Sequence, residues 1–278
     1  MTLSFAVATL TWGNLMNPSE PTLVQCEVLS GVATLTLNDP SKLNALSKPM
    51  IAQLHEQLLR LQKQAGLRAV ILTGAGDKAF VGGANVHSMV GLDPVTGRRF
   101  ITSVHEVCHA IRMLAVPVIA RIDGHALGGG LEIAVSCDLR IASARSKFAM
   151  PEVRLGVPSV IETVLLPGLI GWGRTRMLVY TARSIDAKTA YDWGLVEEVT
   201  DPAQLDAAVR RCVDEIMESD ADVIESQKRL VREWESMTID NAIAYSIDEF
   251  EKTWHRPEPG KRMQAFVRHL EERKAVKK

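Results

Sequence analysis

Two glycine-rich stretches constrain the fold of this chain more than any other feature of its sequence. Residues 80–85 read Phe-Val-Gly-Gly-Ala-Asn, residues 124–132 read Gly-His-Ala-Leu-Gly-Gly-Gly-Leu-Glu, and each follows an apolar, strand-like run. Glycine lets the backbone turn tightly and lets a ligand approach it, because no Cβ is present. The second stretch leads into a helix-like segment, whose start supplies unpaired N–H groups and the positive end of the helix dipole. We therefore predict that both stretches direct backbone N–H groups at one carbonyl oxygen, as in an oxyanion hole.

The pattern of apolar residues around these stretches predicts an α/β fold. Strand-like runs occupy residues 23–28, 32–37, 69–73 and 116–123, and helical periodicity occupies residues 47–65 and 96–114. Strands that alternate with helices favour layers joined by crossovers. Further strands are expected at 137–142 and 195–199, and helices at 160–169, 172–182, 186–193, 202–219, 221–235, 239–254 and 260–274.

The last predicted helix carries an apolar stripe at Met263, Phe266, Val267 and Leu270. Such a stripe must be covered by the body of the same subunit or by a neighbouring one. We therefore expect the protein to form oligomers.

Composition and charge exclude several classes of partner. The 278 residues contain 32 Lys and Arg against 33 Asp and Glu, so we expect neither nucleic acid nor a membrane surface as a partner.

The four cysteines form no Cys-x-x-Cys pair, which is typical of a reducing compartment, and we expect a cytoplasmic location. Residues 1–21 have neither a basic signal-peptide start nor a membrane-spanning run. We expect them to be a leader outside the fold, or the product of a start codon assigned too far upstream.

Two glutamates near the glycine-rich stretches are candidates for acid–base chemistry. Glu132 lies between apolar residues, and Glu152 follows Met150 and Pro151. Taken alone, each is better explained as a structural acid at a helix start. Together, beside an oxyanion hole, two carboxylates suit the holding and deprotonation of a water or the movement of a proton at carbon.

Several motifs in order resemble those of the enoyl-CoA hydratase/isomerase superfamily, which has the crotonase fold. The similarity covers roughly residues 22–274, and its motifs lie at residues 41–46, 78–85, 122–132, 150–156 and 187–196. The resemblance implies an α/β spiral of β-β-α turns with a C-terminal helical trimerisation region. It places the catalytic core at residues 22–200 and the oligomerisation region at residues 201–278. It also implies a homotrimer, or a homohexamer made of two trimers.

The same resemblance implies a role for each matching residue. The N–H groups of Ala84 and Gly129 would bind a thioester oxygen, while Glu132 and Glu152 would hold a water for addition across a 2,3-double bond. The substrate would be a 2-enoyl-CoA thioester, with coenzyme A as part of the substrate and with no metal or tightly bound cofactor. The resemblance assigns coenzyme A contacts to Lys42, Leu43, Ala45, Gly82, Asn85, Val86 and His87, and to Phe266, which would reach the adenine bound by a neighbouring subunit.

The chain departs from the family pattern after the second glutamate. Hydratases usually have Pro-Gly-x-Gly-Gly-Thr here, whereas residues 158–163 read Pro-Ser-Val-Ile-Glu-Thr. Glu162 could add a third carboxylate to the acyl pocket, or it could face solvent on a helix. An isomerase, a decarboxylase, a thioester hydrolase and a non-catalytic coenzyme A-binding protein are the alternatives within this fold.

Two other motifs point to different chemistry. His105, Glu106 and His109 match the His-Glu-x-x-His pattern of zinc metallopeptidases, although no second ligand helix is evident. Residues 74–79 imitate a dinucleotide-binding loop. That interpretation fails because residues 80–83 interrupt the helix that should receive the pyrophosphate.

Overall fold

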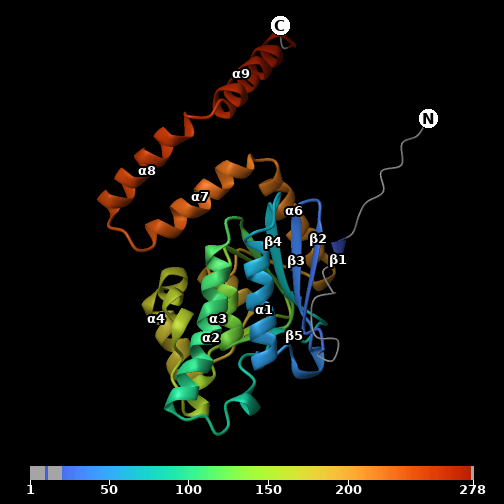
Figure 1. Ribbon diagram of the computed structural model, residues 1–278, viewed down its shortest axis with the longest axis vertical. Coiled ribbons are helices and arrows are strands. Elements are labelled where there is room, and N and C mark those ends of the chain that lie inside the picture. The colour runs from blue at the N-terminus through green and yellow to red at the C-terminus, as the bar shows by residue number, and fades with distance from the viewer. Residues whose placement is uncertain (1–9, 12–20, 277–278) are drawn as a thin grey trace, which may run out of the picture. The chain divides into compact units, whose positions relative to one another are not determined.

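The computed structural model describes residues 10–11 and 21–276, which form two compact units, Met1–Ile224 and Glu225–Lys278 (Figure 1). The first unit contains two β-sheets and the helices packed on them. The second unit is helical. Most of the expected leader lies outside the described residues.

The larger sheet has seven strands in the order β1-β2-β3-β4-β6-β8-β11. The strands are β1 (Leu10–Thr11), β2 (Val24–Leu29), β3 (Val32–Leu37), β4 (Ala69–Gly74), β6 (Val118–Ile122), β8 (Leu139–Ser143) and β11 (Glu198–Thr200). Strand β2 pairs antiparallel with β3 through a hairpin turn in which Ser30 and Gly31 have φ of 51° and 81°. From β3 onward every pairing is parallel.

The smaller sheet has four strands in the order β10-β9-β7-β5. The strands are β5 (Ala79–Val81), β7 (His125–Leu127), β9 (Lys147–Ala149) and β10 (Ile185–Asp186), and β5, β7 and β9 run parallel. The chain alternates between the sheets, from β4 to β5, from β6 to β7 and from β8 to β9. This alternation confirms the predicted spiral of β-β-α turns. Strand β5 overlaps the start of the first glycine-rich stretch and β7 lies inside the second. Each has only three residues, too few for a recognisable period.

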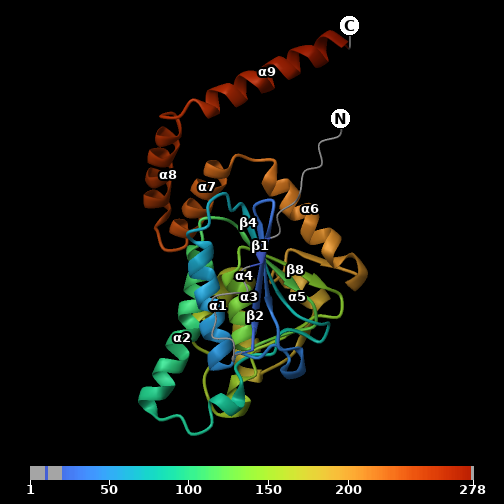
Figure 2. The same cartoon turned by 45° about the vertical axis from the view of Figure 1, so that its right-hand side comes forward.

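Helices cover both faces of the larger sheet. On one side lie α1 (Lys48–Leu61), α2 (Pro94–Met113) and α3 (Gly129–Ser136), and on the other lies α6 (Leu205–Met217) (Figures 1 and 2). Side chains of a strand alternate between faces. Accordingly, Val70 and Leu72 of β4 belong to the core with α1 and α2, while Ala69 packs with Leu205 and Val209 of α6.

The remaining elements of the first unit are short or kinked. They are η1 (Pro40–Lys42), η2 (Val86–Ser88), η3 (Glu152–Leu155), η4 (Ile161–Leu165), α4 (Leu166–Thr181), α5 (Ala187–Trp193) and η5 (Pro202–Gln204). The two helices predicted between residues 160 and 182 are instead η4 and α4, and α4 is kinked at Gly171, whose φ is 77°.

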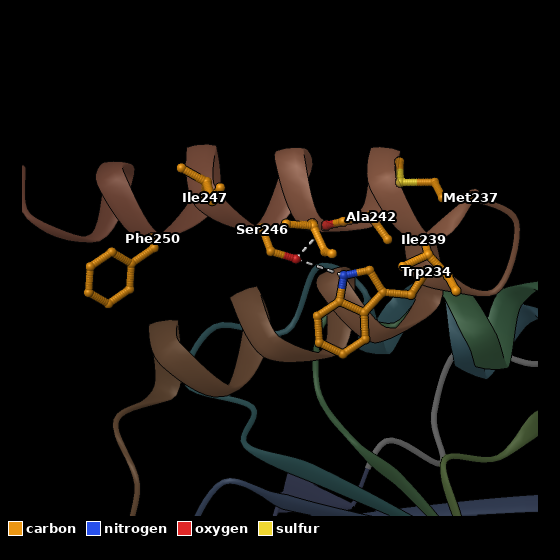
Figure 3. Close-up of a pocket in the computed structure, with 8 residues that line it drawn as sticks. Trp234, Met237, Ile239, Ala242, Ser246, Ile247 and Phe250 are labelled. Atoms are coloured by element: carbon orange, nitrogen blue, oxygen red, sulfur yellow. Dashed lines mark hydrogen bonds between the residues drawn. The ribbon is translucent and has the colours of Figure 1, made fainter.

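The second unit contains most of α7 (Ala221–Trp234), together with α8 (Ile239–Thr253) and α9 (Glu258–Val276). Arg229 of α7 pairs with the Glu249 carboxylate of α8 at 2.7 Å, and the Trp234 indole donates to Ser246 Oγ at 2.9 Å. Residues of α7 and α8 line a largely apolar groove of about 550 Å³ (Figure 3). Because α6 packs on the sheet, the first unit extends beyond residue 200. The assignment of residues 201–278 to oligomerisation stays a prediction.

Among the described residues, no helix has both the length and the apolar character that crossing a membrane requires.

Candidate active site

Three parallel strands of the smaller sheet end where the predicted catalytic residues begin. Strand β5 leads to Gly82, Gly83 and Ala84, β7 leads to Gly128 and Gly129, and β9 leads through Met150 and Pro151 to Glu152. Parallel strands end at the same edge of a sheet, so their pairing brings these segments side by side.

The backbone N–H of Ala84 is available at this edge. Leu46 forms a parallel bridge with Ala84, in which Leu46 N donates to Gly83 O at 2.8 Å and Asn85 N donates to Leu46 O at 3.1 Å. These bonds use the polar groups on either side of Ala84, so its own N–H points away from Leu46. Within the part of the chain that the structure describes, this N–H has no hydrogen-bond acceptor.

The N–H of Gly129 lies close to that of Ala84. Gly129 is the first residue of α3, so its N–H has no acceptor within the helix. A Cβ placed on Gly129 would lie 3.9 Å from the Ala84 nitrogen. Gly128 precedes the helix with φ of 50° and ψ of −121°, a conformation that favours glycine. The fold therefore brings the two predicted N–H donors into one neighbourhood.

Glu132 projects from the first turn of α3 and is buried, with 4% of its surface exposed. Its Oε1 accepts hydrogen bonds from the Thr163 hydroxyl at 2.7 Å and from the Thr163 N–H at 3.3 Å. Its Oε2 lies 3.9 Å from the position a Cβ on Gly129 would take. Burial, with smaller contributions from the charges of Glu152 and Glu162, raises the pKa of Glu132 to about 8.

Glu152 begins η3, directly after Pro151. Its Oε2 accepts a hydrogen bond from the Ser159 hydroxyl at 2.7 Å. Its Oε1 would lie only 2.1 Å from a Cβ on Gly128. Gly128 is therefore needed both for its backbone conformation and for the space that the Glu152 carboxylate occupies.

Glu162 is buried rather than solvent-facing, so the alternative that it lies on an exposed helix surface is wrong. Only 4% of its surface is exposed. Its Oε1 hydrogen-bonds with His105 Nδ1 of α2 at 2.8 Å, whereas Oε2 has no partner among the described residues. On an exposed loop, water would hydrate this carboxylate. Here η4, which carries Glu162, contacts α2 and α3, and these contacts enclose the side chain.

The competing motifs are explained by structural contacts. His105 of the His-Glu-x-x-His pattern is engaged with Glu162, and its ring centroid lies 5.9 Å from that of His109. The described residues contain no group of three or more His, Cys, Asp or Glu that could hold a metal ion. The loop at residues 74–79 joins β4 to β5, so no helix follows it to bind a pyrophosphate.

The segments assigned to coenzyme A lie beside the Ala84 amide. Gly82 N donates to Leu43 O at 2.8 Å, which holds residues 42–46 against residues 82–85. Asn44 fixes this turn, because its buried side chain donates to Ala79 O at 2.8 Å and to Ala75 O at 3.0 Å. Lys42, Leu43, Val86 and His87 are exposed, Gly82, Ala45 and Asn85 are half-buried, and the Asn85 side chain caps η2 through His87 N. Phe266 belongs to the second unit, and its contact with a neighbouring subunit's adenine stays a prediction.

Sequence reasoning missed two contacts of the glutamates. Ser159 and Thr163 hold Glu152 and Glu132, respectively, although neither residue carries a local signal of such a role. The departure from the family pattern at residues 158–163 was the one available indication that this segment is unusual.

Comparisons with known proteins show which family this chain resembles. The family model described as enoyl-CoA hydratase/isomerase matches residues 27–276. A short-chain-enoyl-CoA hydratase of Clostridium acetobutylicum is 35% identical over 85% of this chain and 91% of its own length. A crotonyl-CoA hydratase of Syntrophomonas wolfei is 35% identical over 88% of this chain and 93% of its own length.

A solved structure of enoyl-CoA hydratase from Bacillus anthracis has a TM-score of 0.85 and 29% identity, and the match covers 89% of this chain and 96% of that one. The chain belongs to the enoyl-CoA hydratase/isomerase family.

Proposed function

We propose that this protein is an enoyl-CoA hydratase that adds water across the 2,3-double bond of a 2-enoyl-CoA thioester. The observation that carries the proposal is the position of two glutamates at the same sheet edge as the backbone N–H groups of Ala84 and Gly129. One carboxyl oxygen of each glutamate lies beside Gly128 or Gly129. Relatives named as hydratases of short enoyl-CoA thioesters support this choice of reaction.

The N–H groups of Ala84 and Gly129 would bind the thioester oxygen. Addition of hydroxide to C3 sends electrons through C2 to that oxygen, which becomes the negative oxygen of an enolate. Preorganised N–H donors stabilise such a charge, and the loss of one donor commonly slows a reaction by about 10²–10³-fold. No metal or tightly bound cofactor is required for this step in our proposal.

The two glutamates would handle the water. Glu132 holds the water beside C3, and Glu152 takes a proton from it and passes that proton to C2. The water thus supplies the hydroxyl at C3 and the hydrogen at C2, so the atoms of the addition balance. Two carboxyl groups in unlike surroundings suit this division of labour, because burial favours the protonated form of Glu132.

Coenzyme A would lie along the exposed residues next to the Ala84 amide. The thioester could reach both N–H donors from the edge that carries Lys42, Leu43 and His87.

We also propose a cytoplasmic location, because none of the four cysteines, all within the described residues, forms a disulfide.

The first test of the proposal replaces each glutamate by its amide. We expect Glu152→Gln to lower kcat for hydration of a short 2-enoyl-CoA by about 10²–10⁴-fold, because the amide cannot exchange a proton. Glu132→Gln should also lower kcat, because an amide group replaces the carboxyl group that holds the water. Loss of absorbance of the conjugated thioester measures the reaction. Binding of the substrate should stay near that of the wild-type protein.

Glu106→Gln is the matched control, because Glu106 is an exposed glutamate on α2. Its activity should equal that of the wild-type protein. Undiminished hydration by Glu152→Gln would refute the role of that acid. A wild-type protein that moves the double bond without adding water would favour the isomerase alternative.

A further inference from the structure

Residues 159–163 connect the two glutamates of the candidate active site. At one end, the Ser159 hydroxyl donates to Glu152 Oε2 at 2.7 Å. At the other end, the Thr163 hydroxyl and N–H donate to Glu132 Oε1 at 2.7 and 3.3 Å. One five-residue segment therefore holds one oxygen of each carboxyl group.

The second oxygen of each carboxyl group lies beside the glycine pair at the start of α3. Glu152 Oε1 is 2.1 Å from the position of a Cβ on Gly128, and Glu132 Oε2 is 3.9 Å from the position of a Cβ on Gly129. Because Gly128 and Gly129 are consecutive, the two oxygens lie beside neighbouring backbone atoms. Each glutamate thus has one oxygen engaged by segment 159–163 and one oxygen near the candidate oxyanion hole.

Segment 159–163 is itself fixed in place. Glu162 is buried and hydrogen-bonded to His105 of α2 at 2.8 Å. Ile161 has φ of 43°, which is rare for a β-branched residue and persists only where the surrounding structure imposes it. The segment therefore presents Ser159 and Thr163 to the glutamates in one conformation.

We propose that segment 159–163 is a positioning element that selects Glu152 Oε1 and Glu132 Oε2 as the oxygens that meet water and substrate. This proposal rests on the proposed hydratase function. Ser159 is its most informative residue, because the family pattern usually has glycine here and glycine has no hydroxyl to donate. The terminal torsion of a glutamate side chain is soft, so a hydrogen bond to one oxygen restricts which oxygen is presented.

The test compares Ser159→Ala with Ser159→Thr, which keeps a hydroxyl. We expect Ser159→Ala to lower kcat for hydration by roughly tenfold while KM changes by less than about twofold, because the lost bond orients a reacting group and binds no substrate. Ser159→Thr should retain most of the wild-type kcat. A purely structural role would lower the activity of both variants alongside their thermal stability.

Thr163 offers a second pair of variants at the other end of the segment. Thr163→Val removes the hydroxyl with little change of shape, and Thr163→Ser keeps it. We expect Thr163→Val to lower kcat and Thr163→Ser to retain it. Equal activity of the Val and Ser variants would contradict the selection of Glu132 Oε2.

Crystal structures of wild-type protein and Ser159→Ala separate this proposal from the proposed function. The wild-type Glu152 carboxylate should have one orientation with Oε2 on Ser159, and the variant should show a rotated or divided carboxylate. If the wild-type protein hydrates no enoyl-CoA, the proposed function fails, while these structures still decide the positioning role. An unchanged Glu152 together with an unchanged kcat in Ser159→Ala would overturn the inference.

Discussion

At the scale of single residues, the candidate site depends on where a side chain is absent as much as on where one is present. Gly128 adopts φ of 50° and leaves room for Glu152 Oε1, which a Cβ would approach to 2.1 Å. Glu132 is buried between Thr163 and the glycine pair. Burial makes a carboxyl group keep its proton to a higher pH than it would in the unfolded chain. The protonation of Glu132 therefore contributes to the stability of the fold in a way that depends on pH.

The raised pKa of Glu132 predicts a dependence of stability on pH. The pKa rises from 4.5 to about 8 on folding, so the folded state binds one more proton than the unfolded state between these values. The contribution of Glu132 to the free energy of unfolding is therefore fully present below pH 4.5 and is lost as the pH rises to about 8. The Glu132→Gln variant has no carboxyl group to ionise at this position. The free energy of unfolding of the variant minus that of the wild-type protein should therefore be larger at pH 8 than at pH 5, by on the order of 3 kcal/mol.

Denaturant unfolding at both pH values, at a fixed protein concentration, measures this difference. Glu106→Gln should follow the wild-type protein, since Glu106 is exposed. Parallel curves for the wild-type protein and Glu132→Gln would show that Glu132 titrates normally in the folded state.

At the scale of elements, the close approach of α3 to β5 sets the distance between the two N–H donors. A Cβ on Gly130 would lie 2.2 Å from Val81 O and 2.7 Å from Val81 Cβ. Backbone atoms cannot rotate out of the way, so only glycine permits this contact. The packing of α3 therefore rests on the third glycine of its stretch, while Gly128 and Gly129 form the site.

We expect Gly130→Ala to destabilise the protein by about 1–3 kcal/mol and to lower kcat, because the added methyl group must push α3 away from β5. Chemical denaturation and the hydration assay measure these two effects. The control is Gly168→Ala in α4, where no atom lies within 4 Å of the new Cβ. That variant should be as stable as the wild-type protein or slightly more stable, because alanine favours helices. Equal stability of the two variants would contradict the close packing of α3.

At the scale of the whole molecule, apolar side chains of the C-terminal helices indicate assembly. Ile247 and Phe250 of α8 are each 63% exposed, and the predicted stripe of α9 is exposed at all four positions. Exposed apolar surface of this extent is typical of an interface between subunits. We propose that copies of this chain cover these helices in a homotrimer or a hexamer.

Light scattering after size-exclusion chromatography tests this assembly. The wild-type protein should have three or six times the chain mass of 30.5 kDa. Replacing Phe250 by aspartate should shift the protein to smaller species, because a charge would be buried at the interface. Asp248→Asn, on the same helix, should leave the mass unchanged. A wild-type protein that is monomeric at micromolar concentration would exclude the proposed interface.

The sequence alone was sufficient for the α/β alternation, most helices, the family and the candidate catalytic glutamates. These features are local: strand and helix periods, turn glycines and short motifs are contained in a few consecutive residues. The three-residue strands β5 and β7 were too short for this kind of reasoning.

Only the tertiary structure decided which residues contact the glutamates. Thr163 and Glu132 are 31 positions apart in the chain, and His105 and Glu162 are 57 apart. Such contacts depend on the register of the two sheets and on the packing of η4 against α2 and α3, which no local pattern encodes. The same packing buries Glu162 and so excludes the water that would solvate an exposed carboxylate. The sequence thus determined which groups are available, and the fold determined which of their atoms meet.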